Sequence, residues 1–167
     1  MATVYAVGGA KIYIGGVITT GAADLTSASF TSQTWVEIDG WITMGGIGDS
    51  SEVIRTLLIN RNRVVKQKGP KDAGSMQNTF ADLPSDAGQI AMRAADKTQS
   101  EYAVKVVFDD APPATAPDTS TGTTLLFAAL INGVRRAGGA GNAARTIEST
   151  FEVNSNVVEV AAVLVEG

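Results

Sequence analysis

The sequence contains no histidine and no cysteine among its 167 residues. Histidine is the commonest general base and the commonest metal ligand in proteins, and cysteine is the other residue on which most zinc sites depend. Zinc sites, Ser-His-Asp triads, cysteine nucleophiles and disulfide bonds are therefore excluded. The catalytic options that remain use carboxylates alone, as a glycosidase-like pair or as an oxygen-ligated Mg²⁺ or Ca²⁺ site.

Long hydrophobic runs are also missing. The longest runs from Leu125 to Ile131, far short of the roughly 20 residues that span a bilayer. The first five residues, Met-Ala-Thr-Val-Tyr, contain neither the basic region nor the apolar region of a signal peptide. We therefore expect no signal peptide and no membrane anchor.

Aromatic and basic residues are few. The ten aromatic residues are not clustered as a sugar-stacking surface requires. The net charge is −4 and the calculated isoelectric point is about 4.8. This balance argues against a protein that grips nucleic acid by neutralising phosphates, but it is compatible with a protein that encloses nucleic acid without holding it.

The residues that are present predict one mainly β domain covering residues 1–167. Hydrophobic residues make up 44% of the chain and there are 18 glycines, as in a turn-rich globular protein. Period-two alternation and β-branched runs predict strands. The expected strands cover residues 11–14, 35–39, 52–59, 76–83, 101–108, 123–131, 145–153 and 157–165. With no alternation of strands and helices, this predicts an antiparallel β-sandwich or barrel.

One flanking helix is expected at about residues 85–98. Asp86 is a suitable N-cap, and Gln89 stands three residues later as a capping-box partner. An apolar stripe at helical spacing follows, formed by Ala87, Ile90, Ala91, Ala94 and Ala95. These small side chains predict a helix packed closely over a sheet edge or barrel mouth.

Three segments are expected to be irregular. Residues 17–33 show weak periodicity and predict a flexible arm or loop. Residues 109–122 hold three of the five prolines and predict a surface loop. Residues 133–141 predict a turn.

The most unusual segment is a basic connection, expected as an extended loop over residues 59–75. Six of the 13 basic residues fall within residues 55–71, with no acidic residue among them. They are Arg55, Arg61, Arg63, Lys66, Lys68 and Lys71. Three interpretations stay open: a solvated charge run, an electrostatic contact with an acidic surface of another subunit, and direct phosphate binding, which the absence of interleaved aromatics disfavours.

Three motifs could form a binding or catalytic site, but each is explained better by an ordinary structural role. The run Gly138-Gly139-Ala140-Gly141 lacks the Gly-Lys-Ser/Thr ending of a phosphate-binding loop and predicts a hairpin turn. Asp109-Asp110 precedes prolines that interrupt a calcium loop. Glu148 and Glu152 lie four apart on an expected strand, so they share a face at a spacing of roughly 13 Å, beyond the roughly 5–9.5 Å of a glycosidase pair. We therefore expect no enzyme activity, no catalytic residues, no metal and no cofactor.

A family resemblance rests on the order of these features. The segment Lys68-Gly69-Pro70-Lys71-Asp72-Ala73-Gly74-Ser75-Met76 resembles the loop that enters a core strand of tail tube proteins, the major tail proteins of phages with long non-contractile tails. Gene transfer agents carry similar proteins. The helix and the strand Glu-Ser-Thr-Phe-Glu-Val follow in the family's order, and the resemblance covers roughly residues 35–160.

The resemblance implies a structural virion protein. Members of that family form hexameric rings whose inner sheets join, and the rings stack into a tube through which DNA passes. It implies a homo-oligomer in the virion tail, assembled in the host cytoplasm, with tape measure and terminator proteins as further partners. The alternatives are a head–tail connector or tail terminator ring protein, or a host- or carbohydrate-binding β-sandwich module.

The resemblance also implies roles for individual residues. The basic connection would contact a neighbouring subunit or ring through Arg61, Arg63, Lys66, Lys68, Lys71 and Asp72. Alternating Thr and Glu residues suit a polar lumen, so Glu148 and Glu152 are lumen-facing candidates. Gly69 and Gly74 are expected to serve turn geometry, Gly74 with a positive φ.

Overall fold

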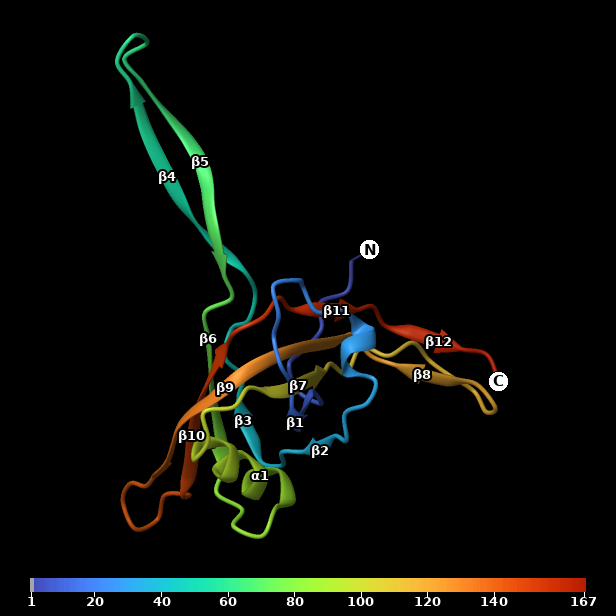
Figure 1. Ribbon diagram of the computed structural model, residues 1–167. Coiled ribbons are helices and arrows are strands. Elements are labelled where there is room, and N and C mark those ends of the chain that lie inside the picture. The colour runs from blue at the N-terminus through green and yellow to red at the C-terminus, as the bar shows by residue number, and fades with distance from the viewer. Residues whose placement is uncertain (1) are drawn as a thin grey trace.

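The computed structural model describes residues 2–167 and is mainly β (Figure 1). Within that range it contains twelve strands, one α-helix and one short 3-10 helix. The strands are β1 Lys11–Val17, β2 Val36–Glu37, β3 Trp41–Thr43, β4 Ser50–Leu58, β5 Arg63–Asp72, β6 Ser75–Ala81, β7 Tyr102–Val107, β8 Thr119–Thr121, β9 Thr124–Ala137, β10 Thr146–Val153, β11 Val158–Val160 and β12 Val163–Val165; the helices are η1 Ser27–Phe30 and α1 Ala87–Asp96.

Eight of these strands form the main sheet. Its order is β2-β1-β7-β9-β10-β6-β3, and β11 pairs with β9. Every pairing is antiparallel, and α1 is the flanking helix. The prediction of a mainly β, antiparallel fold with one helix is therefore confirmed.

The core lies between the sheet and α1. On β10, Ile147, Ser149, Phe151 and Val153 are buried while the residues between them are not, the alternation that the sequence predicted. The largest core side chains come from five elements: Ile12, Ile14, Met76, Phe80, Met92, Phe127, Ile147 and Phe151. Because these elements are far apart in the chain, the core depends on long-range contacts.

Helix α1 begins as predicted but buries a different face. The carboxylate of Asp86 accepts a hydrogen bond from Gln89 N at 2.9 Å, as an N-cap should. The predicted stripe is right for Ala95, which is buried, and for Ala91, which packs against the core, but wrong for the other three residues: Ile90 is 49% exposed, and Ala87 and Ala94 are also exposed. The buried residues are Gly88, Gln89, Met92 and Ala95.

Two local features explain the altered face of α1. Gly88 lies so close to β2 that an added Cβ would stand 2.0 Å from Glu37 O. The Gln89 side chain does not close a capping box. It accepts from Leu83 N at 3.0 Å and donates to Asp39 O and Ala81 O at 2.9 and 2.7 Å. Backbone groups that need a partner therefore draw a polar side chain to the buried face.

Strand β9 is longer than predicted, so the expected turn at residues 133–141 is wrong over its first five residues. The strand continues to Ala137 and pairs there with β10. A register shift falls where Gly133 and Val134 stand opposite Ser149, and Gly133 has a φ of +64°. A bulge with a left-handed glycine allows a strand to bend and continue, so the glycine marks a bulge rather than an end.

The expected extended loop over residues 59–75 is mostly strand. Residues 63–72 form β5, which pairs with β4 along its length, and a turn at residues 59–62 joins the two strands. Lys and Arg side chains occupy positions that a half-buried strand would fill with apolar ones, so the alternation is hidden in the sequence. The result is a two-stranded ribbon, here called the hairpin (residues 50–72), which projects from the body (Figure 1).

A second two-stranded ribbon corrects two further predictions. The expected loop at 109–122 contains β8, and the expected strand at 157–165 divides into β11 and β12. Strand β11 pairs with β9, whereas β12 leaves the main sheet to pair with β8. We call β8, β12 and the residues that adjoin them, 109–122 and 157–167, the wing; it includes β11, which stays paired to the main sheet. The β8–β12 ribbon of the wing projects from the body in another direction than the hairpin (Figure 1).

The segment between β1 and β2 lies against the outer face of the sheet. It contains η1, whose Phe30 is buried and packs with Ala103 and Leu126. Leu25 N donates to Asn156 Oδ1 and Leu25 O accepts from Asn156 Nδ2, at 2.8 and 2.9 Å.

Candidate assembly surfaces

The hairpin combines basic and aliphatic side chains, and both kinds are exposed. Its two strands pack on each other rather than on the body. The exposed aliphatic residues are Val53, Ile54, Leu57, Ile59, Val64 and Val65, with Ile59 at the turn 92% exposed. Exposed apolar surface of this kind marks an interaction site. The run of basic residues in the sequence indicated a charged surface. The exposed aliphatic side chains beside it became evident only once β4 and β5 were seen to pair.

The register divides the hairpin into two different faces. Directly opposite residues share a face, and Val53, Arg55 and Leu57 stand opposite Lys68, Lys66 and Val64. This face, here called the basic face, therefore holds three cations and three aliphatic side chains. Ile54, Thr56 and Leu58 stand opposite Gln67, Val65 and Arg63 on the other face, which has one cation.

No acidic side chain in residues 2–167 forms an ion pair with a basic side chain of the hairpin. The ion pairs in that range involve Arg135, Arg136 and Arg145. On the basic face, Arg55 lies directly opposite Lys66, and like charges in that position destabilise a strand pair. The hairpin is thus a surface that an anionic partner would stabilise.

The predicted loop residues fall at different places in the hairpin. Arg61 lies in the turn, and Arg63, Lys66, Lys68 and Lys71 lie along β5 with exposed side chains. Asp72 has a local role as well: its Oδ1 accepts from Gly74 N at 2.8 Å, and its carbonyl accepts from Ser50 Oγ at 3.2 Å.

The two predicted turn glycines differ. Gly74 has a φ of +69°, in the left-handed region expected of it. Gly69 lies within β5, where the register shifts, and an added Cβ would stand 3.1 Å from Glu52 O. Gly69 therefore permits close strand pairing at a bulge, not a turn.

An open groove of about 300 Å³ lies at the base of the hairpin. Its lining comes from the segment after β1, from the β10–β11 turn and from the end of β5. Asp24, Asp49, Lys71 and Asp72 are among its residues. Lys71 is thus placed near acidic side chains of its own chain, which makes it a weaker candidate for a contact with another copy.

Glu148 and Glu152 project from the same face of β10, as predicted. Thr146, Glu148, Thr150 and Glu152 alternate with the buried residues. Arg135 lies 3.8 Å from Glu148, and both side chains are largely exposed, so this pair contributes little stability. The opposite residues Thr79, Gln77 and Ser75 on β6 extend the polar surface.

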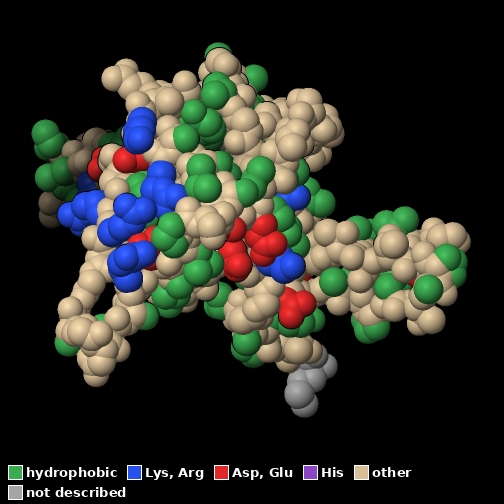
Figure 2. Space-filling view, turned by 90° about the horizontal axis from the view of Figure 1, so that it is seen from below, with side chains coloured by type: hydrophobic (Ala, Val, Ile, Leu, Met, Phe, Trp, Pro, Cys, Tyr) green, Lys and Arg blue, Asp and Glu red, His purple; other side chains and the backbone are tan. Residues whose placement is uncertain are grey.

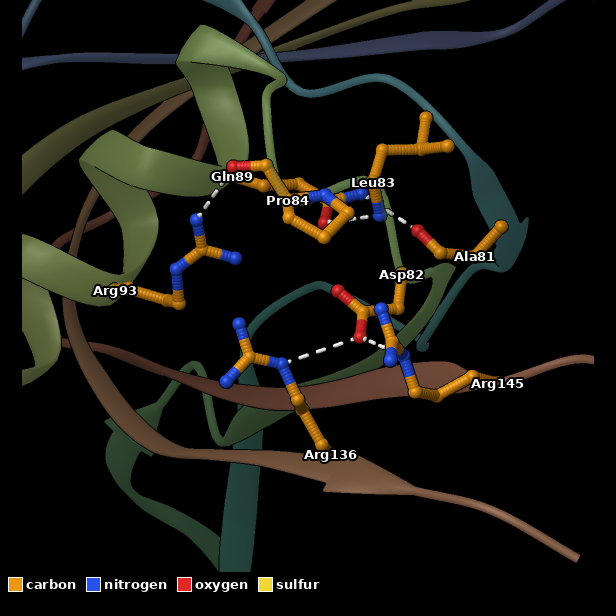
Figure 3. A network of polar contacts seen from close by, with 8 residues as sticks. All are labelled: Ala81, Asp82, Leu83, Pro84, Gln89, Arg93, Arg136 and Arg145. Atoms are coloured by element: carbon orange, nitrogen blue, oxygen red, sulfur yellow. Dashed lines mark hydrogen bonds and ion pairs between the residues drawn. The ribbon is translucent and has the colours of Figure 1, made fainter.

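A buried aspartate and its arginines form a charged cluster that sequence reasoning missed (Figure 3). The Asp82 side chain is fully buried; its Oδ2 accepts from Arg136 Nε at 3.1 Å and forms an ion pair with Arg145 Nε at 2.5 Å. The adjacent Arg93 donates to Pro84 O at 3.1 Å. The pair Arg135-Arg136 was the only signal, and it gave no indication of a buried partner 54 positions away.

The cluster lies at the end of the molecule where α1 and the β9–β10 turn meet. Seen from below, Lys and Arg side chains gather on one side of this face, and Asp and Glu side chains lie beside them (Figure 2). The opposite end carries the hairpin (Figure 1). Basic surface is therefore present at two places, not only in the connection that the sequence identified.

Besides the hairpin and the Asp82 cluster, Lys105 is a further charged residue with defined contacts. Its Nζ lies 4.5 Å from the centre of the Tyr13 ring and 4.9 Å from that of Trp35, within the range of cation–π attraction. Burial lowers the pKa of the Lys105 ammonium group. These three side chains cover the outer face of the sheet, and their contacts do not indicate a catalytic or binding site.

Metal-binding clusters and membrane-spanning helices are both missing from the described part of the chain. Residues 2–167 contain no group of three or more acidic side chains placed to hold a metal ion. No helix of that range is long and apolar enough to cross a membrane.

The whole chain resembles solved structures of tubular assemblies. No family model matches the sequence, and no curated protein matches it. A chain of the PVC sheath/tube terminator of an extracellular contractile injection system matches with a TM-score of 0.65 at 11% identity, covering 96% of this chain and 99% of that one. A chain of the anti-feeding prophage baseplate has the same score and identity, with coverage of 96% and 98%. The SPP1 tail tube matches with a TM-score of 0.53 at 15% identity, over 95% and 77%.

This chain has the tail-tube fold. The family resemblance predicted from residues 35–160 is thereby confirmed for the fold, over 95% or more of the chain in each of the three matches. Identities of 11–15% leave the function to be argued from the surfaces.

Proposed function

We propose that this protein is a structural subunit that self-assembles into stacked hexameric rings to form a tail tube through which DNA passes. The observation that carries the proposal is the near full-length match to chains of tube, terminator and baseplate structures. In this role the protein has no catalytic activity. It works in a virion tail or a related particle, after assembly in the host cytoplasm.

The hairpin supports self-assembly. A two-stranded ribbon is marginally stable alone in water, and this one exposes aliphatic side chains and free strand edges. Contact with another copy would bury both. We propose that Arg61, Arg63, Lys66 and Lys68 contact other copies, Lys66 and Lys68 from the basic face and Arg63 from the opposite face, with Lys71 and Asp72 at the margin.

The polar face of β6 and β10 supports a DNA-conducting lumen. Glu148 and Glu152 give that face negative charge, and six copies at −4 give a ring a charge of about −24. Like charge discourages phosphates from adhering to a wall. We therefore propose that DNA passes this face without specific binding, alongside tape measure and terminator proteins as tail partners.

A terminator or connector that forms a single ring is the second candidate. The match to a chain of a sheath/tube terminator structure favours it. Such a protein would close one end of a tube rather than polymerise. The two functions predict different particles from the same purified chain.

Negative-stain electron microscopy across concentration and salt tests both. Hollow tubes of stacked rings would support the tube subunit, and rings that never stack would support the terminator. The double variant Arg61→Glu, Arg63→Glu should abolish stacking while circular dichroism stays that of the wild type. The matched control is Lys11→Glu, Lys97→Glu, which changes the net charge equally at exposed positions away from the hairpin. A monomer under all conditions, or tubes from the hairpin variant, would contradict the proposal.

A further inference from the structure

We infer that the wing of a second copy is the partner of the hairpin. This inference rests on the proposed self-assembly and names the two surfaces that meet. The basic face of the hairpin of one copy docks on the acidic, aliphatic wing of the next.

The charges of the two ribbons are complementary. The hairpin, residues 50–72, carries six Lys or Arg side chains and two acidic ones, a net charge of +4. The wing, residues 109–122 and 157–167, carries five acidic side chains and no Lys or Arg. Asp118 and Glu166 lie at the end of the β8–β12 ribbon, whereas Asp109, Asp110 and Glu159 lie where the wing joins the body, Glu159 on β11 and Asp110 bonded to Thr123. Complementary patches on one molecule specify and steer association between copies.

The apolar surfaces are matched in the same way. The wing exposes Val163 and Val165 on one face of β12, 45% and 53% exposed, and Leu164 on the other face, 39% exposed. The hairpin exposes Val53 and Leu57 on its basic face, 53% and 59%. Each ribbon is two-stranded within residues 2–167, with outer edges that no further strand covers. Docking would remove aliphatic surface and strand edges from water on both sides.

The register places like charges together on each ribbon. On the hairpin, Arg55 stands opposite Lys66. On the wing, Val165 stands opposite Thr119 as the last pair of the ribbon, and the two acidic residues Glu166 and Asp118 adjoin that pair in the sequence. Asp118 Oδ1 accepts from Gly167 N at 3.1 Å, which holds the strand ends together. Like charges that lie close together repel each other. The repulsion on both ribbons would decrease when the basic side chains of the hairpin lie against the acidic side chains of the wing.

The geometry requires two copies. The hairpin and the wing project from the body in different directions (Figure 1), and their strands do not pack on each other in the chain. Each copy therefore presents two separate surfaces: a hairpin that docks on the next copy, and a wing that receives the hairpin of another copy. Such a head-to-tail interface forms rings where the rotation closes and filaments where it does not.

A cysteine pair tests the contact directly, because the chain has no cysteine of its own. Lys66→Cys protein and affinity-tagged Glu166→Cys protein are mixed under mild oxidation. We expect the mixed disulfide to exceed both homodimers at least tenfold on a non-reducing gel. Lys97→Cys, at the exposed C-cap position that follows α1, replaces Lys66→Cys as the control and should give no such excess. A statistical mixture of dimers, or no disulfide, would overturn the inference.

Charge exchange gives a second, independent measurement. Arg55→Glu, Lys66→Glu protein and Glu166→Lys, Glu159→Lys protein should each associate at least tenfold more weakly than the wild type by sedimentation. Both wing substitutions leave the Asp118–Gly167 hydrogen bond in place, so the wing should stay folded. Mixing the two variants should restore association, since an acidic hairpin then meets a basic wing. A mixture no better than its components would reject the pairing.

The outcomes separate this inference from the proposed function. Wild-type tubes or rings without the cysteine cross-link and without rescue would leave the proposed function standing and overturn the hairpin–wing contact. A monomeric wild type would overturn both. A third outcome concerns DNA. If the Arg55→Glu, Lys66→Glu protein loses affinity for added duplex DNA and no cross-link forms between the cysteine variants, the basic face binds phosphate and the inference is wrong.

Discussion

Gly88 sets the distance between helix α1 and strand β2. A Cβ at this position would stand 2.0 Å from Glu37 O and 2.5 Å from Ile38 Cα, distances that no side chain tolerates. The neighbours are backbone atoms of a short strand, so they cannot move aside as a flexible side chain would. A single missing carbon therefore decides how closely the helix covers the core.

We predict that Gly88→Ala destabilises the protein by about 1–3 kcal/mol, the usual cost of overpacking. The sign is informative because Gly→Ala inside a helix otherwise stabilises by about 1 kcal/mol. Urea denaturation gives the free energy of unfolding. Gly138→Ala, where nothing lies within 4 Å, should change it by less than about 0.5 kcal/mol. A Gly88→Ala protein as stable as the wild type would contradict the packing.

Asp110 shows a residue-scale effect of pH. Its carboxylate accepts from the Thr123 hydroxyl at 2.5 Å and from Thr123 N at 2.6 Å, and these bonds, the hydroxyl first, lower the pKa of Asp110. A lowered folded-state pKa gives stability that is present above the unfolded pKa and is lost as pH falls through the folded one. Thr123→Val should raise the pKa of Asp110 in a carboxyl NMR titration, and Thr123→Ser should keep it low. An unchanged pKa in Thr123→Val would show that the hydroxyl does not matter.

At the scale of elements, Gln89 joins three separate segments. Its buried amide bonds to backbone groups of Asp39, Ala81 and Leu83, so it ties α1 to the connections around β3 and β6. Each of those groups would otherwise be a backbone donor or acceptor without a partner. The helix is therefore held by hydrogen bonds on its buried face, which is not the face of the predicted apolar stripe.

Gln89→Met preserves the length of the side chain and removes all three hydrogen bonds. We predict a loss of about 2–4 kcal/mol in the free energy of unfolding, since buried groups left unpaired cost about 1–3 kcal/mol each and relax in part. Ile90→Gln on the exposed face is the control and should have little effect. Equal stabilities of the two variants by denaturant titration would show that the network is unimportant.

At the scale of the whole molecule, charge is segregated among the surfaces. The hairpin is basic, the wing is acidic and the β6–β10 face is polar with two glutamates. Arg136 and Arg145 instead neutralise a buried aspartate, so those two have a structural role. This segregation suits a subunit that meets copies of itself in fixed orientations.

We predict that Glu148→Lys, Glu152→Lys protein still assembles but that its assemblies retain duplex DNA at low salt and release it at high salt. The exposed Arg135–Glu148 pair contributes little, so stability should change by less than about 1 kcal/mol. Cosedimentation with labelled DNA measures retention. Asp24→Lys, Asp96→Lys protein carries the same charge change elsewhere and should not retain DNA. Equal retention by the two variants would place the glutamates outside the lumen.

The amino-acid sequence by itself determined the class of fold and much of the local structure. Alternation identified the buried and polar faces of β10, and Asp86 identified the start of α1, because both depend on contacts within a few residues. The absence of histidine and cysteine excluded most catalytic sites, because those sites depend on the imidazole and thiol groups themselves.

Only the tertiary structure decided the features that depend on distant partners. The basic segment became a strand because β4 pairs with it, β12 left the main sheet because β8 pairs with it, and α1 turned Gln89 inward because backbone groups near Asp39 and Ala81 need a partner. Asp82 is buried because arginines 54 and 63 positions away neutralise it. These strand pairings, hydrogen bonds and ion pairs join residues that meet only in the folded chain. A pattern within a short stretch of sequence therefore cannot predict them.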